Sequence, residues 1–108
     1  MSKELHDVVG VTFEGRQQIL SDFYKSYKVG GKYEVILERE PNNPYDKNAI
    51  AVHLDVGHMD YKQVGYISKN ENQSLGLKLD KLRCARLNSM GPTTKGDLGL
   101  TIQVEFDD

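Results

Sequence analysis

A short polar segment, residues 39–52, holds the side chains best suited to binding chemistry, because an aromatic ring and a carboxylate stand side by side at Tyr45 and Asp46. Pro41 and Pro44 each fix their own φ and favour extended backbone at the residue before them. The asparagines of the same segment can hydrogen-bond nearby backbone amides. The pattern predicts a rigid loop between two apolar strands, a place where folds commonly present a binding site.

Tyr45 and Asp46 each have a ligand-binding role and a structural role to weigh. An ionised carboxylate only accepts hydrogen bonds, so Asp46 can bind a hydroxyl group and would repel a phosphate. The same carboxylate can also cap the turn through backbone amides, and the two roles are compatible. Tyr45 can pack against the turn, but a ring in a rigid polar loop favours stacking on a planar ligand.

Three blocks of the sequence carry a resemblance to a known family: VVGV at residues 8–11, NNPYDKNAI at 42–50 and VGYISK at 64–69. With these blocks the chain resembles the HIRAN domain, which is found in repair translocases and also as short stand-alone bacterial and phage proteins. The middle block is the specific one. Together with the leucine-rich stretch that follows, the blocks span most of the chain, so we expect one HIRAN-like domain over residues 1–108.

The resemblance implies a ligand and a set of contact residues. Family members that bind DNA take the 3′-terminal nucleotides of a single strand, stacking a base on the tyrosine and bonding the free 3′ hydroxyl through the adjacent aspartate, here Tyr45 and Asp46. A second ring follows the first strand and a phosphate-contacting lysine follows the fourth, here Phe13 and Lys69. The candidate nucleic-acid-binding residues are Phe13, Asn43, Tyr45, Asp46, Lys47, Tyr66 and Lys69.

Structural alternatives stay open for several of these residues. Phe13 continues the alternation of Val9 and Val11, which equally predicts burial in the core. Asn43 is suited to holding the loop through side-chain to backbone hydrogen bonds. Tyr66 occupies a position where the family can have a histidine.

Two positions depart from the DNA-binding members of the family. Thr12 stands where those members have an arginine that contacts phosphate, and Glu14 stands where they have a tyrosine. Losing a cation and gaining a carboxylate weakens attraction to a polyanion. Lys47 and Arg39 flank the loop, and Arg16 and Lys62 can supply replacement cations if the strand geometry brings them to the site.

The apolar pattern predicts a mainly β fold. Ile50, Val52 and Leu54 alternate and should point inward, with Ala51 and His53 on the other face. We expect strands over residues 6–13, 32–40, 49–55, 61–67, 83–90 and 98–106, with helices over 16–27 and 70–82. About six short strands with one or two short helices indicate a small OB-like antiparallel barrel, the same fold that the resemblance implies.

Composition excludes several classes of function. The formal net charge of the 108 residues is only −2, so no general polybasic surface exists and any phosphate contact must be local. The single cysteine, Cys84, forbids an internal disulfide and, between Leu82 and Leu87, is expected to be a small core hydrophobe. Three scattered histidines make neither a metal site nor a catalytic constellation, and no phosphate-cradling glycine loop is present. We therefore expect a non-enzymatic binding domain without cofactor or metal.

The resemblance implies a module that binds 3′-hydroxyl ends of single-stranded DNA, in repair, replication or phage processes. A helicase or another repair protein in trans is the expected protein partner. The alternative is a protein-interaction module with a degenerate DNA pocket, docking through an edge strand or the acidic residues 105–108. No bilayer-spanning apolar run and no basic-then-apolar leader occur, so we expect a cytoplasmic protein without a membrane partner. The oligomeric state stays open.

Overall fold

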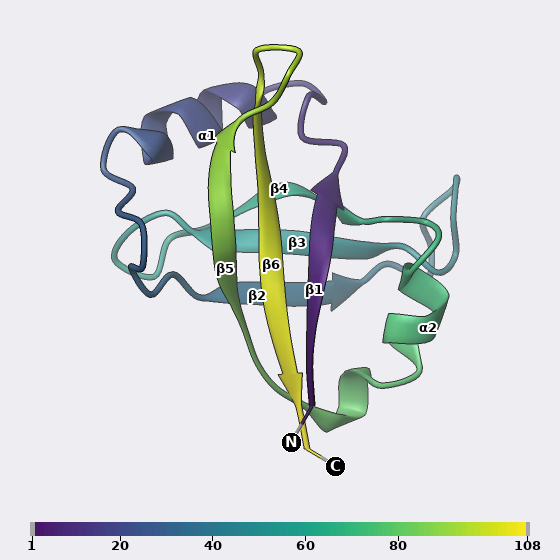
Figure 1. The fold of residues 1–108 in the computed structure, drawn as a ribbon. Helices are drawn as coiled ribbons and strands as arrows, with labels where there is room; N and C mark the ends of the chain where they lie inside the picture. The colour runs from purple at the N-terminus through teal and green to yellow at the C-terminus, as the bar shows by residue number, and fades with distance from the viewer. Residues whose placement is uncertain (1, 108) are drawn as a thin grey trace.

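Six runs of alternating apolar residues form one antiparallel sheet in the computed structural model, which describes residues 2–107 (Figure 1). The strands are β1 (Ser2–Val9), β2 (Val35–Arg39), β3 (Ile50–Asp55), β4 (Tyr61–Ile67), β5 (Leu82–Pro92) and β6 (Leu98–Phe106). The helices are α1 (Arg16–Tyr24), α2 (Asn72–Gly76) and a 3-10 turn, η1 (Leu79–Lys81). The predicted mainly β, antiparallel class is confirmed.

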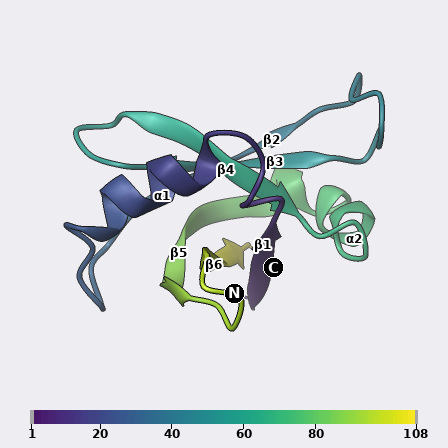
Figure 2. The same cartoon turned by 90° about the horizontal axis from the view of Figure 1, so that it is seen from above.

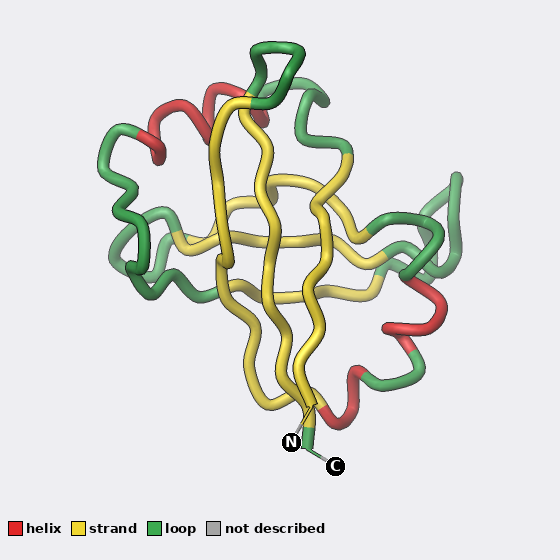
Figure 3. Tube along the Cα trace, in the orientation of Figure 1, coloured by secondary structure: helices red, strands yellow, loops and turns green. Residues whose placement is uncertain are grey.

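The sheet bends over itself into two layers, because β1 belongs to both. Its residues 2–7 pair with β6, whereas Val8 and Val9 pair with Ile67 and Tyr66 of β4. In Figures 1 and 3, β1, β5 and β6 accordingly run across β2, β3 and β4. The strand order is β2-β3-β4-β1-β6-β5.

The two outer strands, β2 and β5, meet only briefly. One isolated bridge joins Glu34 to Arg86, and the Leu87 N–H donates to the Tyr33 carbonyl at 2.8 Å. No ladder between β2 and β5 closes the sheet within residues 2–107. The predicted barrel is therefore better described as an open, strongly coiled sheet.

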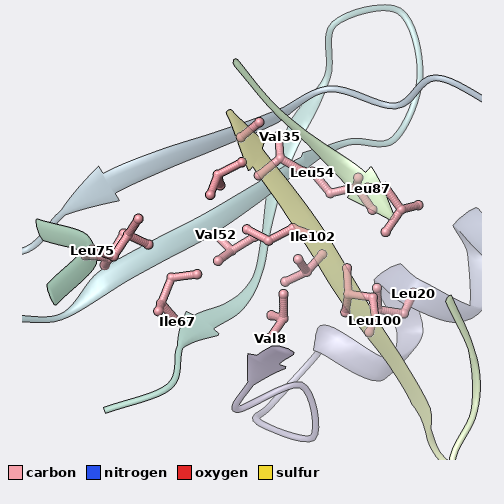
Figure 4. Close-up of a cluster of buried hydrophobic side chains, with 14 of the residues drawn as sticks. Val8, Leu20, Val35, Val52, Leu54, Ile67, Leu75, Leu87, Leu100 and Ile102 are labelled. Carbon is pink, nitrogen blue, oxygen red and sulfur yellow. The ribbon is translucent and has the colours of Figure 1, made fainter. Parts of the chain in front are cut away.

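The core lies between the two layers and includes Val52 and Leu54 from β3 and Ile102 from β6 (Figure 4). Each side chain of this size stabilises the fold by about 1.5–3 kcal/mol when fully buried. Leu20 of α1 and Leu75 of α2 are buried in the same cluster. The helices thus use their apolar residues to seal the space that the open sheet leaves uncovered.

The prediction that alternate residues of β3 point inward is confirmed. The other face of β3 agrees with the prediction only in part. Ile50, Val52 and Leu54 are buried, whereas Ala51 is fully buried too and His53 is half-buried. Both faces of β3 are therefore covered at Ala51, unlike an antiparallel strand with one face in solvent.

The predicted first strand was placed too late. It runs from Ser2 to Val9 rather than from residue 6 to 13, because Gly10 adopts a left-handed φ of 72° that ends the pleat. Residues 10–15 turn, with the Phe13 N–H donating to the Gly10 carbonyl at 3.2 Å, and Gly15 precedes α1. The turn carries Phe13 out of the alternation on which its predicted burial depended.

Other boundaries differ in the same local way. The helix predicted over 70–82 is broken into α2 and η1. The helix α1 ends at Tyr24 instead of residue 27, and β2 begins at Val35 instead of residue 32.

Cys84 is half-buried beside a bulge in β5, and its thiol donates to Glu105 at 2.9 Å, so it is not the core hydrophobe predicted. Across the described chain, no helix has the length and apolarity needed to cross a membrane.

Candidate nucleic-acid interface

The side chain of Asn43 holds the first part of the loop between β2 and β3. Its Oδ1 accepts hydrogen bonds from the N–H groups of Tyr45 at 2.9 Å and Asp46 at 3.1 Å, and its Nδ2 donates to Oε1 of Glu40 at 3.0 Å. The Asn43 N–H also donates to the Glu40 carbonyl at 3.0 Å. The structural role predicted for Asn43 is confirmed, and the loop backbone before the tyrosine and the aspartate is fixed.

Asp46 is held on both carboxylate oxygens. Oδ1 accepts the Asn48 N–H at 2.9 Å, and Oδ2 accepts the side-chain amide of Asn72 at 2.8 Å. These two hydrogen bonds, together with the charge of Lys69, hold the pKa of Asp46 below its ordinary value. The predicted capping role is confirmed, and each oxygen still has a second lone pair for a ligand.

No hydrogen bond or ring contact from residues 2–107 anchors the ring of Tyr45, and the residue is 91% exposed. It borders a cavity of about 790 Å³, a volume typical of small-molecule sites. Phe13 and Tyr66 line the same cavity. In Figures 1 and 2 the β2–β3 loop, which carries Tyr45, lies at the same end of the molecule as α2.

Phe13 and Tyr66 are joined by the guanidinium group of Arg16. Its central carbon lies 4.9 Å from the centroid of the Phe13 ring and 5.3 Å from that of the Tyr66 ring. Nη1 of Arg16 donates to the Gly10 carbonyl at 2.9 Å. Phe13 itself is 65% exposed, so the alternative of core burial is wrong and its ring is available to a ligand.

The cations of the cavity are Arg16, Arg39 and Lys69. Arg39 is positioned by a hydrogen bond of 2.6 Å from Nη2 to the Gly76 carbonyl. Lys62, the other proposed replacement cation, is not part of the lining and pairs with Asp60 at 3.6 Å. Arg16 thus supplies a cation to the cavity, although Thr12 carries no charge.

The structure separates the predicted residues by position. Lys47 is exposed and does not line the cavity, and neither do Thr12 and Glu14. The cavity brings together the other predicted residues, which are Phe13, Asn43, Tyr45, Asp46, Tyr66 and Lys69.

Glu40 and Asn72 are among the lining residues that were not predicted, and both make side-chain hydrogen bonds to predicted residues. The Tyr66 hydroxyl donates to Oε1 of Glu40 at 2.8 Å, and Asn72 is 3% exposed at the start of α2. The only sequence signal that points to Asn72 is its place as a polar residue in the first turn of the leucine-rich helix predicted over 70–82. Glu40 gave a weaker signal, as a charged residue at a strand end.

Within residues 2–107 no three His, Cys, Asp or Glu side chains lie close enough together to hold a metal ion. The site therefore combines exposed rings, three cations and two carboxylates, Glu40 and Asp46. This composition suits a ligand that is planar in one part and anionic in another, with hydrogen-bond donors between.

Comparisons with known proteins agree with one another. The family model of the HIRAN domain matches residues 6–106. Helicase-like transcription factor from Oryctolagus cuniculus is 36% identical over 90 residues, which are 83% of this chain and 8% of that protein. The same protein from Mus musculus is 44% identical over 54 residues, 50% of this chain and 5% of that protein. The chain therefore matches only a small part of these relatives.

A solved structure supports the same assignment. The crystal structure of the HIRAN domain of human HLTF superposes with a TM-score of 0.57 at 25% sequence identity. The superposition covers 95% of this chain and 74% of that one.

Proposed function

Because this chain belongs to the HIRAN domain family, we propose that its cavity binds the free 3′ end of a single DNA strand. The observation that carries the proposal is the rigid presentation of Tyr45 and Asp46 side by side. Asn43 bonds the backbone N–H of both residues, so the backbone positions from which the ring and the carboxylate extend keep a fixed relation. A terminal nucleotide has a planar base and a sugar hydroxyl at a similarly fixed relation.

The rings account for binding of a single strand. Each base has a π-face, and stacking on an exposed aromatic side chain is worth about 1–3 kcal/mol per base. Tyr45 and Phe13 are both exposed at the cavity. In a duplex the bases are already stacked and paired, so their faces are not available to these rings.

The carboxylate accounts for selection of a free end. Its lowered pKa keeps Asp46 charged at neutral pH, in the state that accepts a hydroxyl hydrogen. A 3′ phosphate placed there would bring a second negative charge against it. The site then discriminates an end from a phosphorylated end or an interior position of the strand.

The cations account for local attraction in a chain of net charge −2. Arg16, Arg39 and Lys69 line the cavity against the carboxylates of Glu40 and Asp46. If each cation neutralises one phosphate, the logarithm of affinity should fall with the logarithm of salt concentration with a slope of about −2. Such a slope is shallow, and binding is best measured at low salt.

Fluorescence anisotropy tests the function directly. A short labelled strand with a free 3′ hydroxyl is compared with the same strand carrying a 3′ phosphate and with a blunt duplex. We expect the free hydroxyl to bind about tenfold more tightly than the phosphate. Equal affinity for the hydroxyl and the phosphate would remove end recognition, and no binding by folded protein would remove the DNA function.

The alternative of a protein-interaction module gains little from the acidic end of the chain. Phe106 is buried, Glu105 bonds Cys84 and Arg86, and Asp107 pairs with Arg83. Asp108 lies outside the described residues.

A site for free 3′ ends has its use in repair, replication or phage DNA processing, where a helicase acting in trans would supply the motor.

A further inference from the structure

Glu40 occupies a fixed place at the entrance of the loop. It directly follows β2, its N–H donates to the Ala49 carbonyl at 2.9 Å, and its carbonyl accepts the Asn43 N–H at 3.0 Å. The residue is half-buried and lines the cavity. The Glu40 backbone is therefore hydrogen-bonded through both its N–H and its carbonyl group, which limits the positions that its carboxylate can take.

The two oxygens of this carboxylate differ. Oε1 accepts the Tyr66 hydroxyl at 2.8 Å and the Asn43 side-chain amide at 3.0 Å, which together use both of its lone pairs. Oε2 has no hydrogen-bond donor among residues 2–107, and no ion pair there includes Glu40. Two donors thus orient the carboxylate and leave Oε2 as an acceptor for a ligand.

Asn43 sets the distance between the two carboxylates of the cavity. The same side-chain amide group bonds the backbone of Asp46 and the carboxylate of Glu40. A nucleotide whose 3′ hydroxyl lies at Asp46 would occupy the cavity that Glu40 and the Tyr66 ring also line, and the Tyr66 hydroxyl is hydrogen-bonded to Glu40.

We propose, building on the function proposed above, that Oε2 of Glu40 accepts a hydrogen bond from the edge of the 3′-terminal base. Guanine, cytosine and adenine present an exocyclic amine that can donate to a carboxylate. Thymine and uracil present carbonyl oxygens on both sides of their single ring N–H, and these carbonyl oxygens repel the Glu40 carboxylate. Glu40 makes the site selective for amine-bearing terminal bases.

The decisive measurement compares strands that differ only in the terminal base, dC against dU, because both are pyrimidines of equal size without a methyl group. We expect the wild-type protein to bind the dC end about tenfold more tightly, the value of one well-placed hydrogen bond to a charged group. Guanine against hypoxanthine, which lacks the amine, should show a preference in the same direction.

Glu40→Gln provides the test of the residue itself. The amide retains an oxygen for Tyr66 and Asn43 and places a donor where Oε2 was, so the preference for dC should disappear or reverse toward dU. Glu38→Gln is the matched control, because Glu38 is exposed on β2, contacts His53 at 3.3 Å and lies outside the cavity lining. This control should keep the wild-type preference.

The outcomes separate the two proposals. Equal affinity of wild-type protein for dC and dU ends overturns base selection by Glu40 but leaves 3′-end binding standing. A dC preference that persists in folded Glu40→Gln protein assigns the selectivity to another residue and also overturns the inference. Failure of the wild-type protein to bind any of the strands overturns the DNA function and the base selection with it.

Discussion

The side-chain amide of Asn72 donates a hydrogen bond of 2.8 Å to Oδ2 of Asp46, and so ties the start of α2 to the β2–β3 loop. The two residues are 26 positions apart in the sequence. Asn72 is almost fully buried and Asp46 is half-buried at the cavity. The carboxylate proposed to bind a hydroxyl is therefore positioned by an element outside its own loop.

Asn72→Ala should weaken the fold and loosen Asp46. Removing the donor leaves a carboxylate oxygen without its partner and opens a small buried space, so we expect the free energy of unfolding to fall by about 1–3 kcal/mol. Urea denaturation measures this loss. Asn70→Ala, at an exposed position two residues earlier, is the control and should change stability by less than about 0.5 kcal/mol. Equal effects of the two substitutions would contradict the role of the Asn72 amide.

Acidification should report on Asp46 with a definite sign. Its folded-state pKa is lowered, first by the Asn48 N–H and then by the Asn72 amide. The charged carboxylate therefore stabilises the fold above the unfolded-state pKa, and this stabilisation is lost as pH falls through the folded-state pKa. We expect the melting temperature of the wild type to drop more steeply below pH 4 than that of Asp46→Asn. Asp80→Asn, on exposed η1, should follow the wild-type curve.

Tyr45→Ala should separate binding from stability. The ring is almost fully exposed, so its removal is expected to change the free energy of unfolding by less than about 0.5 kcal/mol. Loss of one stacked base should weaken single-strand affinity by about 1–3 kcal/mol. Fluorescence anisotropy measures the affinity, and thermal melting of the same preparation measures the stability. Unchanged affinity in the variant would exclude Tyr45 from the interface.

Arg16 substitutions distinguish charge from shape. Arg16→Lys keeps the charge but lacks the planar group that lies against both Phe13 and Tyr66, so affinity should fall several-fold while the salt slope stays the same. Arg16→Gln should in addition make the slope shallower by about 0.7. Lys62→Gln, outside the cavity, is the control and should leave the slope unchanged. A slope insensitive to Arg16→Gln would mean that this guanidinium contacts no phosphate.

Gly65→Ala should be the most damaging of these changes. A Cβ atom at Gly65 would lie 2.3 Å from the Val9 carbonyl oxygen and 2.6 Å from a methyl carbon of Val8, so β1 and β4 must move apart. We expect a loss of several kcal/mol or failure to fold, seen by circular dichroism and urea denaturation. Gly91→Ala in β5 is the matched control, since nothing lies within 4 Å of its added Cβ. A stable Gly65→Ala protein would contradict the close contact of the two strands.

The sequence was informative where burial alternates and where prolines and asparagines restrict the chain. The strand predicted over 61–67 agrees with β4, and Asn43 holds the loop as its side chain suggested. The alternation of apolar residues did not predict the exposed position of Phe13, because Gly10 can adopt a left-handed φ or continue a strand with equal ease, whereas the family resemblance had placed Phe13 at the site. The contacts of Asn72 and Glu40 depend on tertiary packing between distant segments, which periodicity does not describe.

The pairing of β1 with β6 brings residues from opposite ends of the chain together, with Ser2 opposite Phe106 (Figure 1). Forming this ladder closes a loop of nearly the whole chain, which costs entropy before any of its contacts form. The same proximity allows circular permutation: a short linker can join the two ends, and new ends can be opened in the exposed turn at residues 94–95 without interrupting a strand. Such a permutant would turn the β1–β6 pairing into a local hairpin and would make the β5–β6 pairing, a local hairpin in the native chain order, the pairing that closes nearly the whole chain.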